Sequence, residues 1–301
     1  KSIIVMKKFL TQKPHCHRVI VRLVEICFRS GVKNQLIAKK YLTADKENGM
    51  VFARGSFDFY RGNIESAFNY FESVKNDRKW GVPAKLCMIE LYLNPNRKYI
   101  WEDIQPLSTE ENIQKAKDLI DQIYSQKVDA DDQILIEKEI MLAELEKSMN
   151  TESSVSAAAS KYQTILTKIE NSSITSLSSS FVVQVLVGLC SCYLRLSRQK
   201  EAVQLIDRLI KPGQFQASLV LEDDSAILQI PKPSHETSSY YEEAYLIRAH
   251  ILMCSTTAGS QQAALHYVYL ALDLNQNSRK GWEICAEAYM KSVMFADAAN
   301  A

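Results

Sequence analysis

Apolar side chains recur at helical spacing along most of the chain, and small residues return among them at fixed offsets. In the clearest set, the second, third and fourth members follow the first by 4, 7 and 16 positions: Trp282, Ala286, Tyr289 and Ala298. The same offsets select Leu186, Cys190, Tyr193 and Ala202, and also Val51, Gly55, Asp58 and Ala67. A fourth set, which keeps the first two offsets, is Tyr245, Ala249, Leu252 and Ala264. The pattern predicts pairs of antiparallel helices, because small side chains let two helix backbones approach closely.

A second helix is expected after each of these turns. Residues spaced by four and then three share one face there: Ala67, Phe71 and Val74; Ala202, Ile206 and Leu209; Ala264, Val268 and Ala271. The chain is therefore predicted to be all-α, a single solenoid of seven helical hairpins over residues 17–48, 48–81, 82–127, 131–170, 179–212, 239–276 and 279–301. Insertions at 94–108 and 213–238 exceed the usual connection lengths, so we expect them to be partner-binding loops or poorly ordered.

The composition disfavours several classes of protein but does not indicate a function. The chain has only 9 Gly and 7 Pro in 301 residues, which disfavours turn-rich all-β folds. A formal net charge of +1 argues against nucleic-acid binding driven by phosphate neutralisation, and no apolar run reaches the roughly 18 residues of a membrane-spanning helix. The 7 cysteines are odd in number and scattered through apolar stretches, as expected of reduced thiols rather than a disulfide framework. Neither end carries a helix cap or a signal peptide, so we expect both to be cut edges of a longer chain.

No motif of catalysis or phosphate binding is present in the sequence. The chain lacks GxGxxG, GxxxxGK[ST], GxSxG, HExxH and paired CxxC strings. His15–Cys16–His17 is a poor metal site, since helical residues two apart point away from one another and a structural zinc needs four ligands. Cys190 and Cys192 have the wrong spacing for a redox pair and are expected in the core. We therefore predict no enzyme activity, no cofactor, no metal and no small-molecule substrate.

Four aromatic residues are the candidate partner-binding positions. Phe59 and Tyr60 fall late on the first helix of the second hairpin, near the expected concave wall. Tyr99 and Trp101 lie outside the hairpin pattern, in the 94–108 insertion. A large aromatic residue in such a loop either folds back onto its own chain or anchors in a partner. Both alternatives stay open at this point.

The offsets resemble those of the tetratricopeptide repeat, a helix–turn–helix unit of about 34 residues. Such repeats stack into a right-handed superhelix whose extended concave surface binds peptides, helices or other solenoids. Repeats that grip a terminal carboxylate use Asn at the ninth position of the first helix. That position holds a different residue in every hairpin where it can be placed: Glu25, Ser56, Ser191, His250 and Glu287. The resemblance therefore does not extend to that role.

A closer resemblance rests on particular strings and their order. Residues 49–55 read GMVFARG, 59–71 carry a second glycine turn, and Trp80–Gly81 precedes the string Leu93–Asn94–Pro95–Asn96. Residues 239–246 and 278–283 follow in matching order. In these strings and their order, the chain resembles the C-terminal region of the tetratricopeptide repeat protein 21 family, whose members are subunits of intraflagellar transport complex A.

The resemblance implies a non-enzymatic scaffold that supports retrograde ciliary transport and the entry of ciliary cargo. Its implied partners are other complex A subunits with β-propeller and helical-repeat domains, with no nucleic acid and no direct membrane insertion. The implied location is the cilium or flagellum, at the axoneme and basal body on the cytoplasmic side. The alternative is a cytosolic peptide-binding adaptor built from the same repeats.

Overall fold

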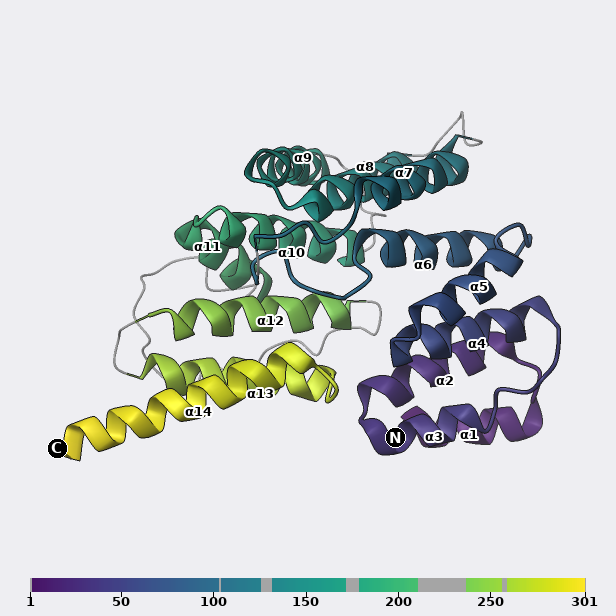
Figure 1. Ribbon diagram of the computed structural model, residues 1–301, viewed down its shortest axis with the longest axis horizontal. Helices are drawn as coiled ribbons and strands as arrows, with labels where there is room; N and C mark the ends of the chain where they lie inside the picture. Colours follow the sequence, from purple (N-terminus) through teal and green to yellow (C-terminus); the bar gives the residue numbers. More distant parts are fainter. Residues whose placement is uncertain are drawn as a thin grey trace. The chain divides into compact units, whose positions relative to one another are not determined.

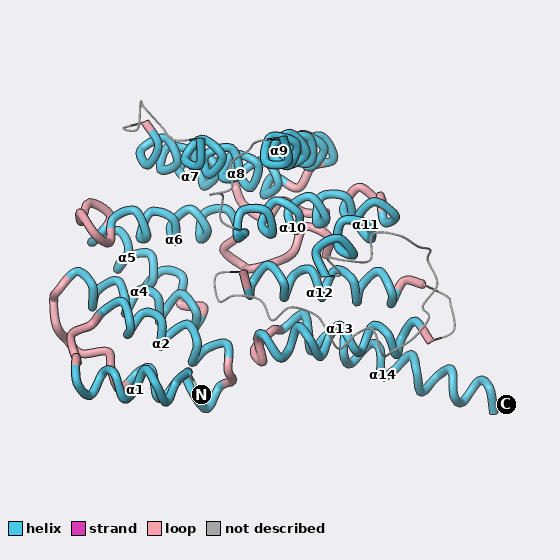
Figure 2. Tube along the Cα trace, turned by 180° about the vertical axis from the view of Figure 1, so that it is seen from behind, coloured by secondary structure: helices cyan, strands magenta, loops and turns pink. Residues whose placement is uncertain are grey.

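The computed structural model describes residues 2–102, 104–125, 132–171, 179–210, 237–255 and 259–300. Within these ranges the chain forms fourteen α-helices and no strand, which confirms the all-α prediction (Figures 1 and 2). The described residues group into two compact units. Unit 1 draws on residues 1–98, 107–129 and 275–278, and unit 2 on residues 99–106, 130–274 and 279–301.

Unit 1 contains the first seven helices in antiparallel succession. They are α1 (Ser2–Gln12), α2 (His17–Arg29), α3 (Val32–Lys39), α4 (Asn48–Arg61), α5 (Ile64–Val74), α6 (Gly81–Leu93) and α7 (Glu110–Tyr124). The hydrophobic pattern had not predicted α1. The hydrophobic core between the first helices contains fully buried side chains, among them Leu23, Val24 and Cys27.

Unit 2 contains the other seven helices. They are α8 (Asp132–Met149), α9 (Glu152–Asn171), α10 (Ser179–Arg195), α11 (Gln199–Ile210), α12 (Ser238–Met253), α13 (Ser260–Leu274) and α14 (Arg279–Asn300). The first helices of its successive hairpins contact one another: α8 packs on α10, α10 on α12 and α12 on α14. We call these four helices the helix wall of unit 2. The predicted insertion at 213–238 lies outside the described residues except for its last two positions.

Two hairpins turn in the same way at their tips. After α4, Gly62 has a left-handed φ of 87°, and the Asn63 N–H donates to the Asp58 carbonyl at 2.9 Å. After α10, Ser197 has a φ of 61°, and the Arg198 N–H donates to the Tyr193 carbonyl at 2.8 Å. A left-handed residue with a bond spanning six residues is the usual way to satisfy the last carbonyls of a helix. The short turns then bring α5 and α11 back along their partners.

Small residues lie where the offsets predicted close helix packing, with one exception. Gly55 is buried, and a Cβ atom there would lie 2.8 Å from the ring of Phe71 on α5. Ala202, Ala249 and Ala264 are fully buried. Ala286, however, is exposed, as are Trp282 (55%) and Tyr289 (49%). In α14 the opposite face is buried instead, through Ile284, Cys285 and Ala288. The predicted turn after Tyr289 is absent: residues 279–300 form one continuous helix, so Ala298 does not lie on a second helix that packs against Ala286.

The thiols behave as core residues. All seven cysteines are free, and Cys190 and Cys192 are buried within α10. Burial raises the pKa of the Cys192 thiol to about 12 and that of Cys27 to about 11, so both stay protonated at neutral pH. No helix in the part of the chain that the structure describes is both long and apolar enough to cross a membrane.

Candidate functional site

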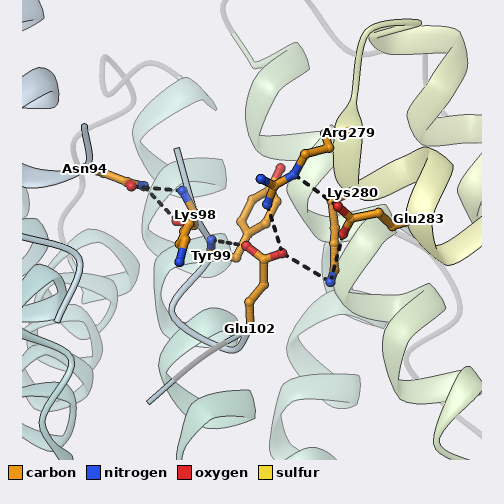
Figure 3. A network of polar contacts seen from close by, with 7 residues as sticks. All are labelled: Asn94, Lys98, Tyr99, Glu102, Arg279, Lys280 and Glu283. Atoms are coloured by element: carbon orange, nitrogen blue, oxygen red, sulfur yellow. Dashed lines mark hydrogen bonds and ion pairs between the residues drawn. The ribbon is translucent and has the colours of Figure 1, made fainter. Parts of the chain in front are cut away.

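The 94–108 insertion is the feature that brings the predicted aromatic residues into defined surroundings. Its first part belongs to unit 1, where Asn94 closes a turn: its side-chain amide donates to the Lys98 carbonyl at 2.7 Å, and its Oδ1 accepts the Lys98 N–H at 2.9 Å (Figure 3). The turn places Arg97 over α4. Its guanidinium lies 4.1 Å from the ring centre of Phe59 and 5.6 Å from that of Tyr60, and donates to the Phe59 carbonyl at 2.6 Å.

Phe59 and Tyr60 are therefore engaged by their own chain. Phe59 is 7% exposed and its ring meets that of Tyr60 edge-on, with centres 5.3 Å apart. Tyr60 is half-buried, and burial followed by the nearby Glu25 carboxylate raises the pKa of its phenol. The sequence had placed both residues on the concave wall. The structure places Phe59 in the core, so a role of this pair in partner binding stays a prediction.

The second part of the insertion belongs to unit 2 and begins with a tight turn. The Glu102 N–H donates to the Tyr99 carbonyl at 3.0 Å, and the Tyr99 N–H donates to the Glu102 carboxylate at 2.7 Å. Ile100 is 2% exposed and Trp101 is 9% exposed. Trp101 therefore folds back onto its own chain, and a role of Trp101 or Tyr99 in partner binding stays a prediction. We call residues 99–102 together with 104–106 the strap.

A carboxylate of the strap is bound by two cations at the start of α14. Glu102 Oε1 lies 3.1 Å from Lys280 Nζ and 3.7 Å from an Arg279 guanidinium nitrogen (Figure 3). The Glu102 side chain is only 11% exposed, so this pairing takes place largely away from water. Glu283, one turn along α14, accepts from the same two cations at 3.1 and 3.5 Å. Two carboxylates thus share two cations at a helix N-terminus, where the helix dipole also favours negative charge.

The Trp101 indole lies in an aromatic slot on the helix wall. Its ring stacks on Tyr99, with centres 5.1 Å apart and planes at 17°, and lies 4.9 Å from the imidazole of His250 on α12. Lys280 Nζ is 5.5 Å from the centre of the Trp101 ring. Burial and the Lys280 charge lower the pKa of His250, so the imidazole facing the indole is neutral at pH 7. The indole Nε1 is buried and has no hydrogen-bond partner.

The strap is fastened at a second point, beyond α8. The Asn150 side-chain amide donates to the Gln105 carbonyl at 2.9 Å. Asn150 is itself 1% exposed, and its Oδ1 accepts from Arg195 Nε of α10 at 3.0 Å. Asn150 after α8 and residues of α12 and α14 therefore hold the strap, and Arg195 of α10 fixes Asn150. Sequence reasoning missed Arg279, Lys280 and Asn150, and His250 was noticed only as an isolated histidine and as the occupant of a ninth position.

A second polar group lies inside the helix wall. The Lys147 ammonium pairs with Glu144 at 2.6 Å, and the Tyr162 hydroxyl donates to the other oxygen of that carboxylate at 2.6 Å. The Ser191 hydroxyl donates to Glu243 of α12. Burial lowers the pKa of Lys147, but the Glu144 and Glu243 carboxylates outweigh this and the net shift is upward. Burial raises the pKa of Glu243 against the opposing influence of Lys147 and Ser191.

We expect a Glu243→Gln variant to gain stability relative to the parent as the pH rises. A raised pKa means that the folded state holds the proton more tightly than the unfolded one. The contribution of Glu243 to the stability of the parent protein is therefore complete below the ordinary pKa of 4.5. It is lost as the pH rises through the raised pKa that Glu243 has in the folded state. Urea titrations followed by circular dichroism between about pH 4 and about pH 7 measure the difference between the two proteins. A difference that stays constant over this range contradicts the assignment.

The His15–Cys16–His17 segment does not act as a cluster of its own. In the described residues, His17 instead approaches Asp45 and Glu47, whose ligand atoms and the imidazole nitrogen all lie within 4.8 Å of one another. His17 Nε2 is 3.6 Å from the Glu47 carboxylate, and Glu47 is 62% exposed. His17 opens α2 and Glu47 precedes α4, so two helix N-termini converge here and repel a cation. We interpret the Asp45 and Glu47 carboxylates as groups that stabilise the N-terminus of α4 rather than as metal ligands.

A match to a family model covers the first helices of the chain. The model of the TT21 fifth ARM repeats domain matches residues 1–93, which hold α1–α6. Residues 1–93 are thus similar to a domain of the tetratricopeptide repeat protein 21 family. This match agrees with the helical-repeat fold seen in both units.

The curated relatives of the tetratricopeptide repeat protein 21 family are of modest identity. Tetratricopeptide repeat protein 21B of Xenopus laevis is 26% identical over 110 residues, 35% of this chain. The human 21B protein is 28% identical over 90 residues, 28% of the chain, and the Caenorhabditis elegans 21 homolog is 30% identical over 102 residues, 31% of the chain. The matched stretch spans 8%, 7% and 8% of these three relatives.

Proposed function

We propose that this chain is part of a non-enzymatic scaffold subunit of intraflagellar transport complex A, which supports retrograde ciliary transport and the entry of ciliary cargo. The observation that carries the proposal is the match of residues 1–93 to the tetratricopeptide repeat protein 21 family. Its partners are other complex A subunits with β-propeller and helical-repeat domains, and it acts at the axoneme and basal body, on the cytoplasmic side. Stacked helical hairpins suit this work, because binding is spread over many repeats and concentrated in a few buried anchors.

The surface chemistry of unit 1 is consistent with a scaffold rather than an enzyme. A shallow hollow over α5, α6 and α7 is lined mainly by apolar side chains, including Ile64, Phe68 and Leu91. Its carboxylate is Glu65, and the other titratable group among the lining residues is the Tyr92 phenol, whose pKa is raised by burial so that it stays protonated. Acid–base catalysis needs a pair of such groups in reach of one substrate, so this hollow supports contact better than chemistry.

Affinity purification of the full-length protein from ciliated cells tests the proposal. We expect subunits with β-propeller domains to co-purify in a stable complex, and the tagged protein to lie along the cilium and at its base. Cells without the protein should accumulate cargo that normally returns from the ciliary tip, and full-length protein should restore its return. The tag alone is the control. A diffuse protein that captures no propeller-containing subunit would refute the assignment.

A peptide-binding adaptor of the cytosol is the second candidate. The observation in its favour is that the helix wall of unit 2 already holds a non-helical segment, the strap, through side chains of more than one hairpin. This function predicts a soluble peptide ligand and no assembly with propeller-containing subunits, so the purification above separates the two candidates.

A further inference from the structure

We infer that unit 2 carries a binding site for a protein segment that turns at an aromatic residue followed directly by a carboxylate, and that Trp101 and Glu102 of the strap fill this site in cis. The inference uses only contacts within unit 2. It therefore holds or fails independently of the ciliary role proposed above.

The carboxylate subsite is formed by the first turn of α14. Lys280 is 20% exposed and lies 3.1 Å from the Glu102 carboxylate, and Arg279 approaches it from the more exposed side at 3.7 Å. Two cations and a helix N-terminus together favour one anion strongly, and more so where water is partly excluded. Glu283 alone cannot neutralise both cations, so removal of Glu102 leaves a net positive, half-buried subsite. The occupant must therefore be acidic at this position.

The aromatic subsite is formed by His250 and Lys280 from two neighbouring helices of the wall. The neutral imidazole lies 4.9 Å from the indole, and the ammonium lies 5.5 Å from its centre. A flat π-system that faces a cation and a ring is bound well there, whereas an aliphatic side chain loses both interactions. One lysine thus contacts the aromatic ring and pairs with the following carboxylate. This shared contact sets the order of the two residues.

A competing segment can displace Trp101 and Glu102 from the site. Trp101 loses the hydration of its Nε1 and gains no hydrogen bond in return. A competing segment with Phe at this position avoids that loss. Glu102 also divides its carboxylate between the cations and the Tyr99 N–H. The strap therefore occupies the site mainly because it is tethered there, and less because its contacts are optimal. For a short linker, the effective concentration of the tethered segment is on the order of millimolar.

A labelled synthetic peptide with the sequence of residues 97–106 tests the site in trans. Fluorescence anisotropy measures its binding to the 301-residue chain, to Trp101→Ala/Glu102→Ala and to the same double variant with Lys280→Glu. We expect the double variant to bind at least about 10-fold more tightly than the parent, because the tethered competitor is gone. Adding Lys280→Glu should abolish that gain. A peptide with Ala and Gln at its Trp and Glu positions should bind neither protein.

Matched variants distinguish a specific binding site from non-specific electrostatic attraction of the peptide. Lys168→Glu makes the same charge change elsewhere in unit 2, at a lysine that pairs with Glu139 at 2.6 Å, and should leave peptide binding intact. Should the double variant fail to fold by circular dichroism, Glu102→Gln keeps the shape of the strap and should still raise the peptide affinity several-fold. Equal losses from Lys280→Glu and Lys168→Glu, or no gain in any strap variant, overturn the inference.

Discussion

Replacement of Lys147 by Met should lower the free energy of unfolding of unit 2 by about 3–5 kcal/mol, because a buried ion pair loses one partner. Lys147 is 14% exposed and pairs with Glu144 at 2.6 Å. The variant leaves the Glu144 carboxylate with the Tyr162 hydroxyl alone, and it removes the positive charge that opposes the burial of Glu243. Both carboxylates then face a low-dielectric interior without a cation. Urea titration followed by circular dichroism measures the loss.

Lys168→Met is the matched control for this prediction. Lys168 also pairs with a glutamate, Glu139, at 2.6 Å, but the two side chains are 52% and 38% exposed. Exposed pairs contribute about 0–1 kcal/mol, since water solvates both charges in either state. Similar losses from the two variants would show that the Lys147 group is not a buried network.

Replacement of Phe71 by Ala should lower the free energy of unfolding of unit 1 by about 3–5 kcal/mol, the usual range for deleting a fully buried aromatic side chain. Phe71 is 0% exposed, and its ring centre lies 5.3 Å from that of Phe52 and 6.3 Å from that of Phe59. Gly55 lies against the same ring and has no side chain of its own that could fill the cavity. Thermal and urea unfolding of the variant measure the effect.

Phe9→Ala deletes the same atoms at a position that is 38% exposed on α1. We expect it to cost less than half as much, because less apolar surface is returned to water and no closed cavity forms. An equal cost at both positions would contradict the packing described for α4 and α5.

The helices and much of their pairing could be predicted from local pattern alone. The offset from Gly55 to Ala67, with Phe71 one turn further on, specified that α4 and α5 approach closely and which residue fills the space between them. The prediction was wrong at Ala286, because the offset pattern names a packing position without saying whether a neighbour occupies it. The α1 helix was missed because the first residues carry no repeat offsets.

The candidate site was only partly predictable. Trp101 and Tyr99 stood out as large aromatic residues in an insertion, and this signal found them. Their surroundings did not stand out, since Lys280 and Arg279 look like ordinary surface cations at the start of a helix. Asn150 looks like a turn residue until its contacts with Gln105 and Arg195 are known.

The sequence by itself determined that this chain is helical and that its helices pair through recurring small residues, and it carries strings that resemble those of a known family. These properties depend on neighbours within one or two turns or one hairpin, which is the range over which periodicity carries information. Only the tertiary structure decided that Trp101 is buried, that Glu102 meets Lys280, and that Glu144, Lys147 and Tyr162 form one group with Glu243 nearby. Those contacts join residues far apart in the chain, and their free energy depends on exclusion of water, which no local pattern records.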